Sequence, residues 1–350
     1  MRSRFSPLVQ LTLFKVRELL REPEALFWVF VFPLLLALAL GIAFREPGEP
    51  EAVRVGIQES PDAARLAEAL DVAPNVDARI LPAAEARREL AAGHVHLVVL
   101  PTGSPETGWT YWYDPVRPES RLARMAVDDA LQRAAGRTDP VDVGDRELTE
   151  KGSRYIDFLI PGLLGLNLLS TGIWGVGYYV VNARTKKLLK RLTATPMRRS
   201  HFLASQITGR LVFLGPEAIV LLGVAVFAFG VPVRGSVWTL ALLILLGGLS
   251  FCGLGLLIAS RTRTIEGVSG LMNLVLLPMW VLSGIFFSTE RFPDAVQPVI
   301  QALPLTAEID ALRAVMLEGA TLGEVAHEAA IVLAWGVVTF LLALKLFRWR

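Results

Sequence analysis

Two histidines separated by a single residue, His94 and His96, are side chains whose type and spacing could do chemistry. They open the segment HVHLVVLP, which has the composition of a β-strand, so both imidazoles should point to the same side of it. Such a pair suits a metal ion, but a zinc site takes three or four ligands and the sequence offers no third ligand at a suitable spacing. We interpret both as strand residues and expect no metal site in this chain.

Catalytic machinery is not evident elsewhere in the sequence. No arrangement of a nucleophile with a base stands out. The motif G-x-x-x-x-G-K-[ST], whose backbone cradles the phosphates of ATP, does not occur. We expect that the chain is not an enzyme, that it binds no cofactor itself, and that any ATP it depends on is hydrolysed by a partner subunit.

One carboxylate stands inside an apolar stretch. Glu217 lies seven residues into the run 211–231 and follows Gly215 and Pro216. An unpaired charge at the centre of a membrane helix costs on the order of 2.5–3.5 kcal/mol. Glu217 should therefore face a bundle interior, a cavity or a subunit interface, where it could contact a polar or cationic substrate on a translocation path or couple two helices. The alternative is a side chain that reaches the nearby inner surface of the membrane.

The elements that must position these residues are mainly apolar helices. Hydrophobic residues make up 53% of the 350 residues and the mean hydropathy is +0.48. Crossing about 30 Å of hydrocarbon takes about 20 helical residues. Six segments are long and apolar enough: 25–44, 156–181, 211–231, 238–259, 270–287 and 326–347. We predict a membrane all-α bundle of six transmembrane helices, with an α/β domain inserted between spans 1 and 2.

The positive charges indicate the orientation of these spans. If the N-terminus is inside, the inner segments carry 18 Lys and Arg residues, of which eight lie between 184 and 210 and Arg210 is the last of those. The outer segments other than the acidic insert carry four. Since cytoplasmic loops are enriched in Lys and Arg, both termini are predicted to be cytoplasmic. Residues 1–24 should hold a cytoplasmic interfacial helix, because apolar positions recur at helical spacing from Val9 to Leu20.

The acidic insert, residues 45–152, contains 20 acidic and 13 basic residues in a chain whose net charge is +2. Strand-like segments (VRVGIQ, NVDARIL, HVHLVVLP and WTYWYD) alternate with helix-like ones. This alternation predicts a compact α/β domain. The charge rule places the domain on the extracytoplasmic side.

Between the second and third spans lies a basic loop, residues 182–210, with the sequence NARTKKLLKRLTATPMRRSHFLASQITGR; we call it the basic elbow. Pro196 disfavours helix at the residue before it, so the helix leaving the membrane should end near Thr195. Ser200 could then cap a new helix that runs into the third span. We expect Leu189, Leu192 and Met197 to be exposed here, which favours a protein groove that receives them. The alternative is contact with anionic lipid headgroups alone.

After the fifth span, SGIFFSTERFPDAVQPVIQALPLTAEIDALRAVMLEG has apolar segments too short to cross a membrane. Prolines interrupt it, Pro304 among them, and Thr306 is expected to cap a helix that carries Asp310 and Arg313. We predict re-entrant outer helices near 289–325 that dip into the outer leaflet or lie on it.

Together these segments resemble the membrane subunits of type-2 ATP-binding-cassette (ABC) exporters, in the branch with a large extracytoplasmic domain. KRLTATPMRRSHFL resembles the coupling segment of that family, SGIFF…FP…Q…LPLT…DALR resembles the element before its last span, and YIDFLIPGLLGLNLL fits its second span. One departure is that many relatives carry an acidic pair before the coupling segment, where NARTKK is wholly basic.

The resemblance implies that residues 153–350 form a five-span permease domain. It implies that the elbow seats in a groove on a partner ATPase through Leu189, Leu192, Thr195, Pro196 and Met197. It further implies a dimer with a second, identical or different permease in a bacterial inner membrane. The cargo would be multidrug-like, or a lipid or polysaccharide. A periplasmic adaptor is a further candidate partner, and nucleic acid is not expected to bind.

Two alternatives remain open at this point. A secondary transporter should show inverted repeats and charged residues within several spans, and Glu217 is the one charge we identify there. A membrane-anchored protein whose outer domain binds a ligand or partner would leave the basic elbow and the outer helices without a role.

Overall fold

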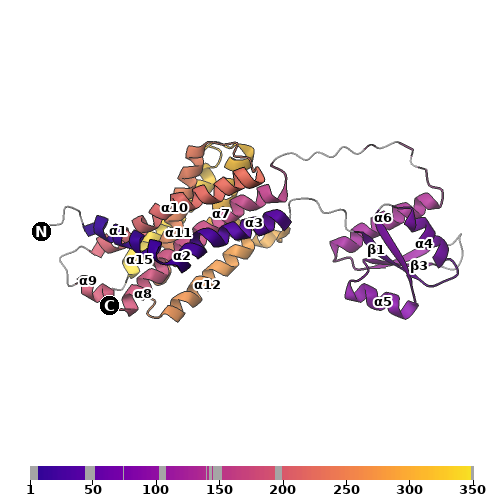
Figure 1. Ribbon diagram of the computed structural model, residues 1–350, viewed down its shortest axis with the longest axis horizontal. Coiled ribbons are helices and arrows are strands. Elements are labelled where there is room, and N and C mark those ends of the chain that lie inside the picture. Colours follow the sequence, from indigo (N-terminus) through magenta and orange to yellow (C-terminus); the bar gives the residue numbers. More distant parts are fainter. Residues whose placement is uncertain are drawn as a thin grey trace. The chain divides into compact units, whose positions relative to one another are not determined.

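The computed structural model describes residues 7–43, 52–73, 75–101, 108–138, 140–141, 144, 152–193 and 199–347. The chain divides into two compact units. The helical unit comprises Met1–Glu46 and Leu148–Arg350, and the sheet unit comprises Pro47–Glu147. Figure 1 shows helices throughout the first and a small twisted sheet in the second.

Five helical stretches of the helical unit are long and apolar enough to cross a membrane: Tyr155–Thr185, His201–Phe229, Val237–Ala259, Ile265–Leu282 and Ala326–Leu346. The first of these is built from α7 (Tyr155–Ile173), the π-helical turn η2 (Trp174–Tyr178) and α8 (Tyr179–Thr185). The others belong to α10 (Arg199–Phe229), α11 (Val237–Ala259), α12 (Ile265–Leu282) and α15 (Ala326–Leu346). The second to sixth predicted spans are therefore helices in the structure.

The first predicted span, 25–44, is also helical but shorter. It consists of α2 (Pro23–Leu26), the π-helical turn η1 (Phe27–Val31) and α3 (Phe32–Ala43). Its apolar part, Phe27–Ala43, falls short of the length of the other five stretches. The structure thus supports five long apolar helices and a sixth shorter one.

Two helices begin before the apolar runs that predict their spans. Helix α10, which carries the third span, begins at Arg199, next to Ser200, where a new helix is expected to start. The fifth was expected over 270–287, but α12 begins at Ile265, where the Thr264 hydroxyl accepts a hydrogen bond from Gly267 N. It ends at Leu282, and Gly284 then takes a left-handed φ of 73°.

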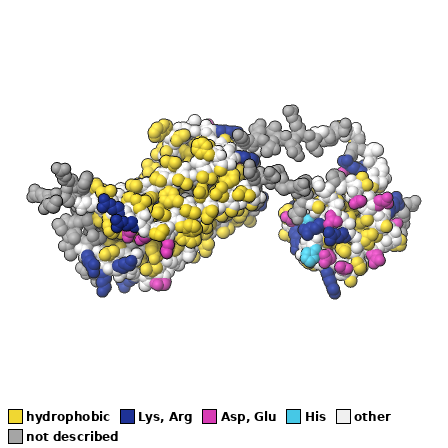
Figure 2. All heavy atoms as spheres, in the orientation of Figure 1, with side chains coloured by type: hydrophobic (Ala, Val, Ile, Leu, Met, Phe, Trp, Pro, Cys, Tyr) yellow, Lys and Arg dark blue, Asp and Glu magenta, His cyan; other side chains and the backbone are white. Residues whose placement is uncertain are grey.

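The central helix of the unit is α11, which packs against α7, α10, α14 and α15. It crosses α7 at small residues. A Cβ atom at Gly172 would lie 2.8 Å from Phe251 Cβ, and one at Gly255 would lie 2.7 Å from Ile173 O. Glycines at these positions let the two backbones approach closely, as is typical of helix crossings in membranes. Figure 2 shows hydrophobic side chains over most of the visible face of this unit.

The outer segment between α12 and α15 contains short helices. These are the 3₁₀ turns η3 (Thr289–Arg291) and η4 (Asp294–Val296), then α13 (Gln297–Gln301), α14 (Pro304–Arg313) and the π-helical turn η5 (Ala314–Glu318). The connection from α13 to α14 reaches the middle of its neighbours. Trp335 Nε1 of α15 donates to Ala302 O over 2.9 Å, and a Cβ atom at Gly165 of α7 would lie 2.6 Å from Ile309.

The capping expectation for Thr306 is wrong. Helix α14 begins at Pro304, with Leu303 as its N-cap, because a proline is well suited to the first helical position. Thr306 therefore lies inside the first turn, is 1% exposed, and its hydroxyl has no hydrogen-bond partner among the described residues.

The sheet unit is a four-stranded sheet in the order β2-β1-β3-β4. The strands are β1 (Val53–Gln58), β2 (Val76–Leu81), β3 (Leu97–Pro101) and β4 (Trp109–Tyr113), close to the predicted segments. β1 is parallel to β2 and β3, whereas β4 runs antiparallel to β3. In the helix layers, α4 (Ala63–Asp71) and α6 (Pro118–Ala134) share a core with β1 and β3, and α5 (Ala83–Ala92) packs against Val98 in a separate cluster.

His94 and His96 precede β3 rather than lie on it, and they contact different side chains. His94 Nδ1 is 3.2 Å from Glu89 Oε2, and His96 Nε2 is 3.2 Å from Arg54 Nη2. Within the described ranges, no three His, Cys, Asp or Glu side chains gather so as to hold a metal ion. Charged side chains of both signs are mixed over the visible face of this unit (Figure 2).

Candidate functional site

The candidate site begins at the basic elbow, where α8 leads into α9 (Leu188–Thr193). Lys187, between these helices, takes a left-handed φ of 58°, which turns the chain. Leu189 is 1% exposed and belongs to the core of the helical unit. Its expected exposure is therefore wrong, because the turn at Lys187 folds α9 back onto α8. Leu192 lies on α9, and Thr195, Pro196 and Met197 lie outside the described residues.

Arg184, at the end of α8, holds the start of the elbow against the rest of the unit. Its Nη1 donates to Ala259 O over 2.8 Å and to Thr262 O, and its Nη2 donates to Ser260 O over 3.2 Å. Its guanidinium also lies 5.3 Å from the centroid of the Phe347 ring, just after α15. The last carbonyls of a helix lack helical partners and attract cations. Arg184 thus caps α11 and ties the elbow to the α11–α12 turn.

Helix α1 (Pro7–Arg21) braces the same region, and its presence confirms the predicted N-terminal helix. It packs along α10, where the hydroxyls of Thr12 and Thr208 are 2.9 Å apart. Lys15 Nζ lies 3.1 Å from the centroid of the Tyr179 ring of α8, a cation–π contact. Burial lowers the pKa of Lys15 to about 8, although Glu18 nearby acts in the opposite direction. α1 therefore contacts both helices that lead into the elbow.

Deeper in the unit, Glu217 is paired. Its carboxylate accepts hydrogen bonds from Nη1 and Nη2 of Arg210, and the ion pair is buried, with the two residues 4% and 7% exposed. Arg210 Nη2 also donates to the hydroxyl of Thr171 on α7. Glu217 therefore lies inside the helical unit, one of the surroundings expected for it, and Arg210 compensates its charge there.

Room for this ion pair comes from a glycine. A Cβ atom at Gly175, in the π-helical turn η2, would lie 3.3 Å from Arg210 Cδ. Such π turns occur often where a helix accommodates a functional group. Glu217 also borders a shallow recess whose other walls include Val29, Pro33 and Leu34 of the first apolar helix and Asn167 of α7. The first helix therefore covers the side of α10 that carries the carboxylate.

The outer helices are fixed by Arg313. Its Nη2 donates to Phe158 O over 3.3 Å and to Gly284 O over 3.0 Å, its Nη1 is 3.4 Å from Asp310 Oδ1, and its guanidinium lies 3.9 Å from the centroid of the Phe158 ring. One side chain thus joins α14, the start of α7 and the end of α12. Pro304 and Thr306 are buried at the other end of α14. Asp310 and Arg313 also border an outer cavity of about 600 Å³ with Glu318, Glu324 and Glu328.

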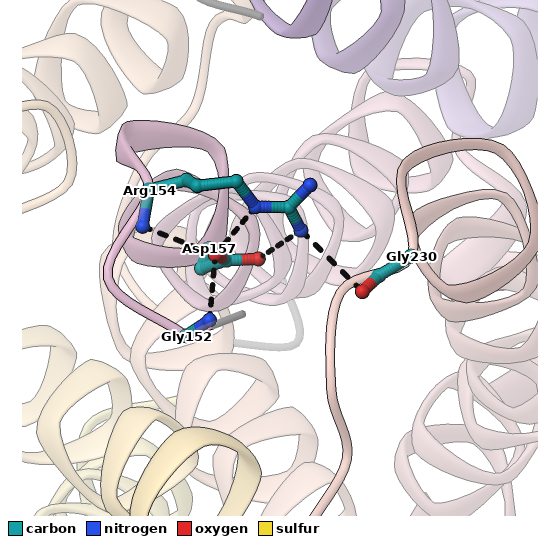
Figure 3. Close-up of polar contacts among 4 residues, drawn as sticks. All are labelled: Gly152, Arg154, Asp157 and Gly230. Carbon is teal, nitrogen blue, oxygen red and sulfur yellow. Dashed lines mark hydrogen bonds and ion pairs between the residues drawn. The ribbon is translucent and has the colours of Figure 1, made fainter. Parts of the chain in front are cut away.

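A second outer junction stands where the chain enters α7 (Figure 3). Asp157 is fully buried, and its Oδ2 accepts from Gly152 N over 2.9 Å, Arg154 N over 3.1 Å and Arg154 Nε over 2.9 Å. Arg154 Nη2 donates to Asp157 Oδ1 over 2.8 Å and reaches Gly230 O, after α10, over 3.4 Å. The Asp157 carboxylate raises the pKa of Arg154. This junction fixes the start of α7 to the end of α10.

Sequence patterns did not single out Arg154, Asp157, Arg184 and Arg210 as structural residues. Three of them carried a usable signal. Asp157 follows Arg154 by three residues, the spacing of a capping box at a helix start, and Glu217 follows Arg210 by seven, close to two helical turns. Arg184 gave no such signal, because its carbonyl partners lie more than 70 residues away.

These polar groups are arranged to bind helices to one another and to transmit movement between them. The polar groups join helices in pairs at the elbow, in the centre and at the outer end, which is suited to relaying displacement between them. The arginines of these junctions bond carboxylates or backbone carbonyls, and none of the groups in the junctions is arranged as a nucleophile beside a base. The geometry is that of a membrane bundle whose two ends are tied to its core.

Comparisons with known proteins identify the family. The family model of the ABC-2 family transporter proteins matches residues 23–345. The probable multidrug ABC transporter permease YbhS of Escherichia coli (strain K12) is 26% identical over 340 residues, which cover 87% of each chain. Nodulation protein J of Bradyrhizobium diazoefficiens is 29% identical over 57% of this chain and 76% of its own length. The inner membrane transport permease YadH of Escherichia coli (strain K12) is 25% identical over 59% of this chain and 78% of its own. The family match spans both the elbow and the outer helices, and we conclude that this chain belongs to the ABC-2 family of transporter proteins.

Proposed function

We propose that the chain is the permease subunit of an ATP-driven exporter and that a separate ATPase subunit supplies the energy. Membership of the ABC-2 family supports the transport function. The lack of a G-x-x-x-x-G-K-[ST] motif supports a borrowed ATPase, because this loop is what cradles ATP phosphates. We propose a dimer of two permease chains, identical or different, each paired with one ATPase.

The proposed arrangement has six spans in a bacterial inner membrane, with η1 and α3 as the first. The excess of Lys and Arg in the inner segments supports cytoplasmic termini and an extracytoplasmic position for residues 45–152. The contacts of Ala302 and Ile309 with the middle of α15 and α7 support a re-entrant course for 289–325. Lipid-exposed irregular backbone is avoided in membranes, and this segment is covered by α7, α11 and α15.

The observation that carries the coupling proposal is the attachment of the elbow by Arg184 to the end of α11. In this proposal the ATPase groove receives Leu192, Thr195, Pro196 and Met197. Leu189 is buried, and its role in this proposal is to pack α9 against the helical bundle. A push on the elbow then moves α8 together with α11, because Arg184 bonds both.

The cargo is proposed as a class of compound and not as one molecule. The description of YbhS as a probable multidrug permease supports multidrug-like cargo, with lipids or polysaccharides as the alternative class. Glu217 and its recess are proposed to border the translocation path, and Pro304, Thr306, Asp310 and Arg313 to shape its outer end. A periplasmic adaptor is a further proposed partner, whose contact would be the sheet unit.

The test is co-purification of the chain with an ATPase that carries a P-loop and is encoded beside it. Leu192→Asp combined with Met197→Asp should abolish both co-purification and ATP-dependent efflux, because a groove lined for apolar side chains rejects carboxylates. The matched control is Val116→Asp in the sheet unit, where the residue is 85% exposed and the same change should have no effect. Retention of ATPase and efflux in the double variant contradicts the coupling proposal.

A further inference from the structure

Glu308 is a carboxyl group enclosed in the helical unit that neither the elbow nor the Arg210–Glu217 pair involves. It lies on α14 and is 0% exposed. Neither Oε1 nor Oε2 has a hydrogen-bond partner among the described residues. Buried polar atoms are nearly always bonded, so this group requires an explanation of its own.

The carboxyl group occupies a niche on α11 that exists because residue 247 is glycine. A Cβ atom there would lie 2.6 Å from Glu308 Cδ, 2.7 Å from Oε1 and 2.9 Å from Oε2. Gly247 comes ten residues after Val237, the first residue of α11, or about 15 Å along the helix at 1.5 Å per residue. The carboxyl group therefore lies near the middle of the apolar span and not at its polar end.

No side chain in the described part of the chain brings an opposite charge to it there. Helix α11 carries no Asp, Glu, Lys or Arg. On α14 itself, Arg313 contacts Asp310 and the carbonyls of Phe158 and Gly284. The titratable groups on the other elements that pack against α14, or on α11 itself, are Tyr155 and Asp157 of α7, Cys252 of α11, Glu266 of α12, Glu318 of η5, and His327, Glu328 and Lys345 of α15.

Apart from Cys252, these groups lie at the ends of their elements, and Glu318 is the last residue of η5. Tyr155 and Asp157 are in the first turn of α7, His327 and Glu328 in the first turn of α15, and Glu266 in the first turn of α12. Lys345 is in the last turn of α15, and Cys252 is five residues beyond Gly247. Among the described residues, none of these forms an ion pair or hydrogen bond with Glu308. An isolated carboxylate in such surroundings loses its hydration without replacement, so the group takes up a proton instead.

We propose that Glu308 is a proton-binding site, which holds a proton while α14 packs on α11 at Gly247 and releases it when the two helices part. The close fit at Gly247 is what excludes water. Any widening of this contact admits water, and the ionised form then regains its hydration. An opening movement of the outer helices is thereby linked to the loss of one proton.

The decisive measurement is the infrared difference spectrum between the wild-type chain and Glu308→Gln, both in lipid nanodiscs. It is recorded at about pH 7.5, where an ordinary glutamate with a pKa of about 4.3 is ionised. We expect the carbonyl stretching band of one protonated carboxylic acid in the wild-type spectrum that is lost in Glu308→Gln. Glu266→Gln, an exposed glutamate of α12, is the matched control and should remove carboxylate bands alone. Absence of the acid band from the Glu308 difference overturns the proposal.

Release is tested by wedging the helices apart with Gly247→Ala. The added Cβ would overlap the carboxyl group, so the acid band should weaken as the pH is raised through a lower range than in the wild type. Gly223→Ala on α10, where no atom lies within 4 Å of the added Cβ, should leave the band unchanged. A folded Gly247→Ala chain whose band titrates as in the wild type rules out release. If that chain does not fold, Glu308→Asp, which withdraws the carboxyl group from Gly247 by one methylene, takes its place with the same two outcomes.

Discussion

Arg210 and Glu217 lie seven residues apart on α10 and form an ion pair inside the helical unit. Seven residues are close to two helical turns, so both side chains share one face and the pair is contained within a single helix. The link to α7 is the additional bond from Arg210 to Thr171. Movement of α10 against α7 therefore breaks one hydrogen bond while the ion pair stays intact.

This division of roles predicts unequal effects of substitution. Glu217→Met leaves the guanidinium buried without its counter-charge, and we expect the free energy of unfolding to fall by about 3–5 kcal/mol. The double variant Arg210→Met with Glu217→Met should recover most of this loss, because it removes both desolvated charges. Thr171→Val should cost only about 1–3 kcal/mol. Denaturant unfolding of the purified chain in detergent measures all three, and equal losses in the single and double variants would contradict the buried pairing.

The hydrogen bonds of Arg184 are expected to restrain the basic elbow against the α11–α12 turn. Arg184→Ala removes the bonds to Ala259, Ser260 and Thr262, so the chain after α8 should separate from the α11–α12 turn more often. Trypsin should then cleave at Lys186, Lys187 and the later basic residues several-fold faster. Arg261→Ala is the control, since it also removes one cation after α11 but leaves the Arg184 bonds intact. Equal cleavage rates in the two variants would show that these bonds do not restrain the elbow.

The close crossing of α7 and α11 predicts that the free energy of unfolding depends strongly on the glycine at position 255. Gly255→Ala places a Cβ atom 2.7 Å from Ile173 O and 2.8 Å from Ile173 Cα, which are backbone atoms that cannot rotate away. We expect a loss of about 1–3 kcal/mol in the free energy of unfolding, as for other overpacked contacts. Gly223→Ala is open to space and should be neutral, or stabilising by up to about 1 kcal/mol through helix propensity. A neutral Gly255→Ala would mean that the two helices cross further apart.

Much of this fold follows from local pattern. The apolar runs predict six spans, of which five are long apolar helices in the structure, and the alternation of strand-like and helix-like segments predicts the elements of the sheet unit. The family resemblance rests on the segments KRLTATPMRRSHFL and LPLT…DALR, and the family match confirms it. These features are encoded within 10 to 20 neighbouring residues, where periodicity and turn residues act.

The features that the sequence did not predict depend on where a helix begins or on distant contacts. Hydropathy misses the pairing of Arg210 with Glu217, because the apolar run starts at Leu211 and leaves Arg210 outside it, although α10 begins twelve residues before that run. Leu189 is buried because α9 folds back, which no pattern within the elbow specifies. Glu308 is enclosed by a glycine 61 positions earlier in the chain. Hydropathy records the character of each residue and not its partner.

The raised pKa of Asp310 predicts that its contribution to the stability of the folded chain depends on pH. Its side chain is 47% exposed, and burial of the remainder raises its pKa to about 6, with Arg313 acting in the opposite direction and Glu328 in the same one. Because this pKa is above that of the unfolded chain, the folded form binds the proton more tightly. The stabilising contribution is therefore full below about pH 4 and is lost as the pH rises through about 6. Solvent screening keeps it small, below about 1 kcal/mol.

The measurement is the midpoint of thermal unfolding as a function of pH, in the wild type and in Asp310→Asn. The wild-type midpoint should fall between about pH 5 and about pH 7 by more than that of Asp310→Asn, whose side chain cannot ionise. Asp294→Asn, at an exposed position of the same outer segment, should retain the wild-type slope. Identical slopes in the wild type and Asp310→Asn would contradict the assignment of this pH response to Asp310.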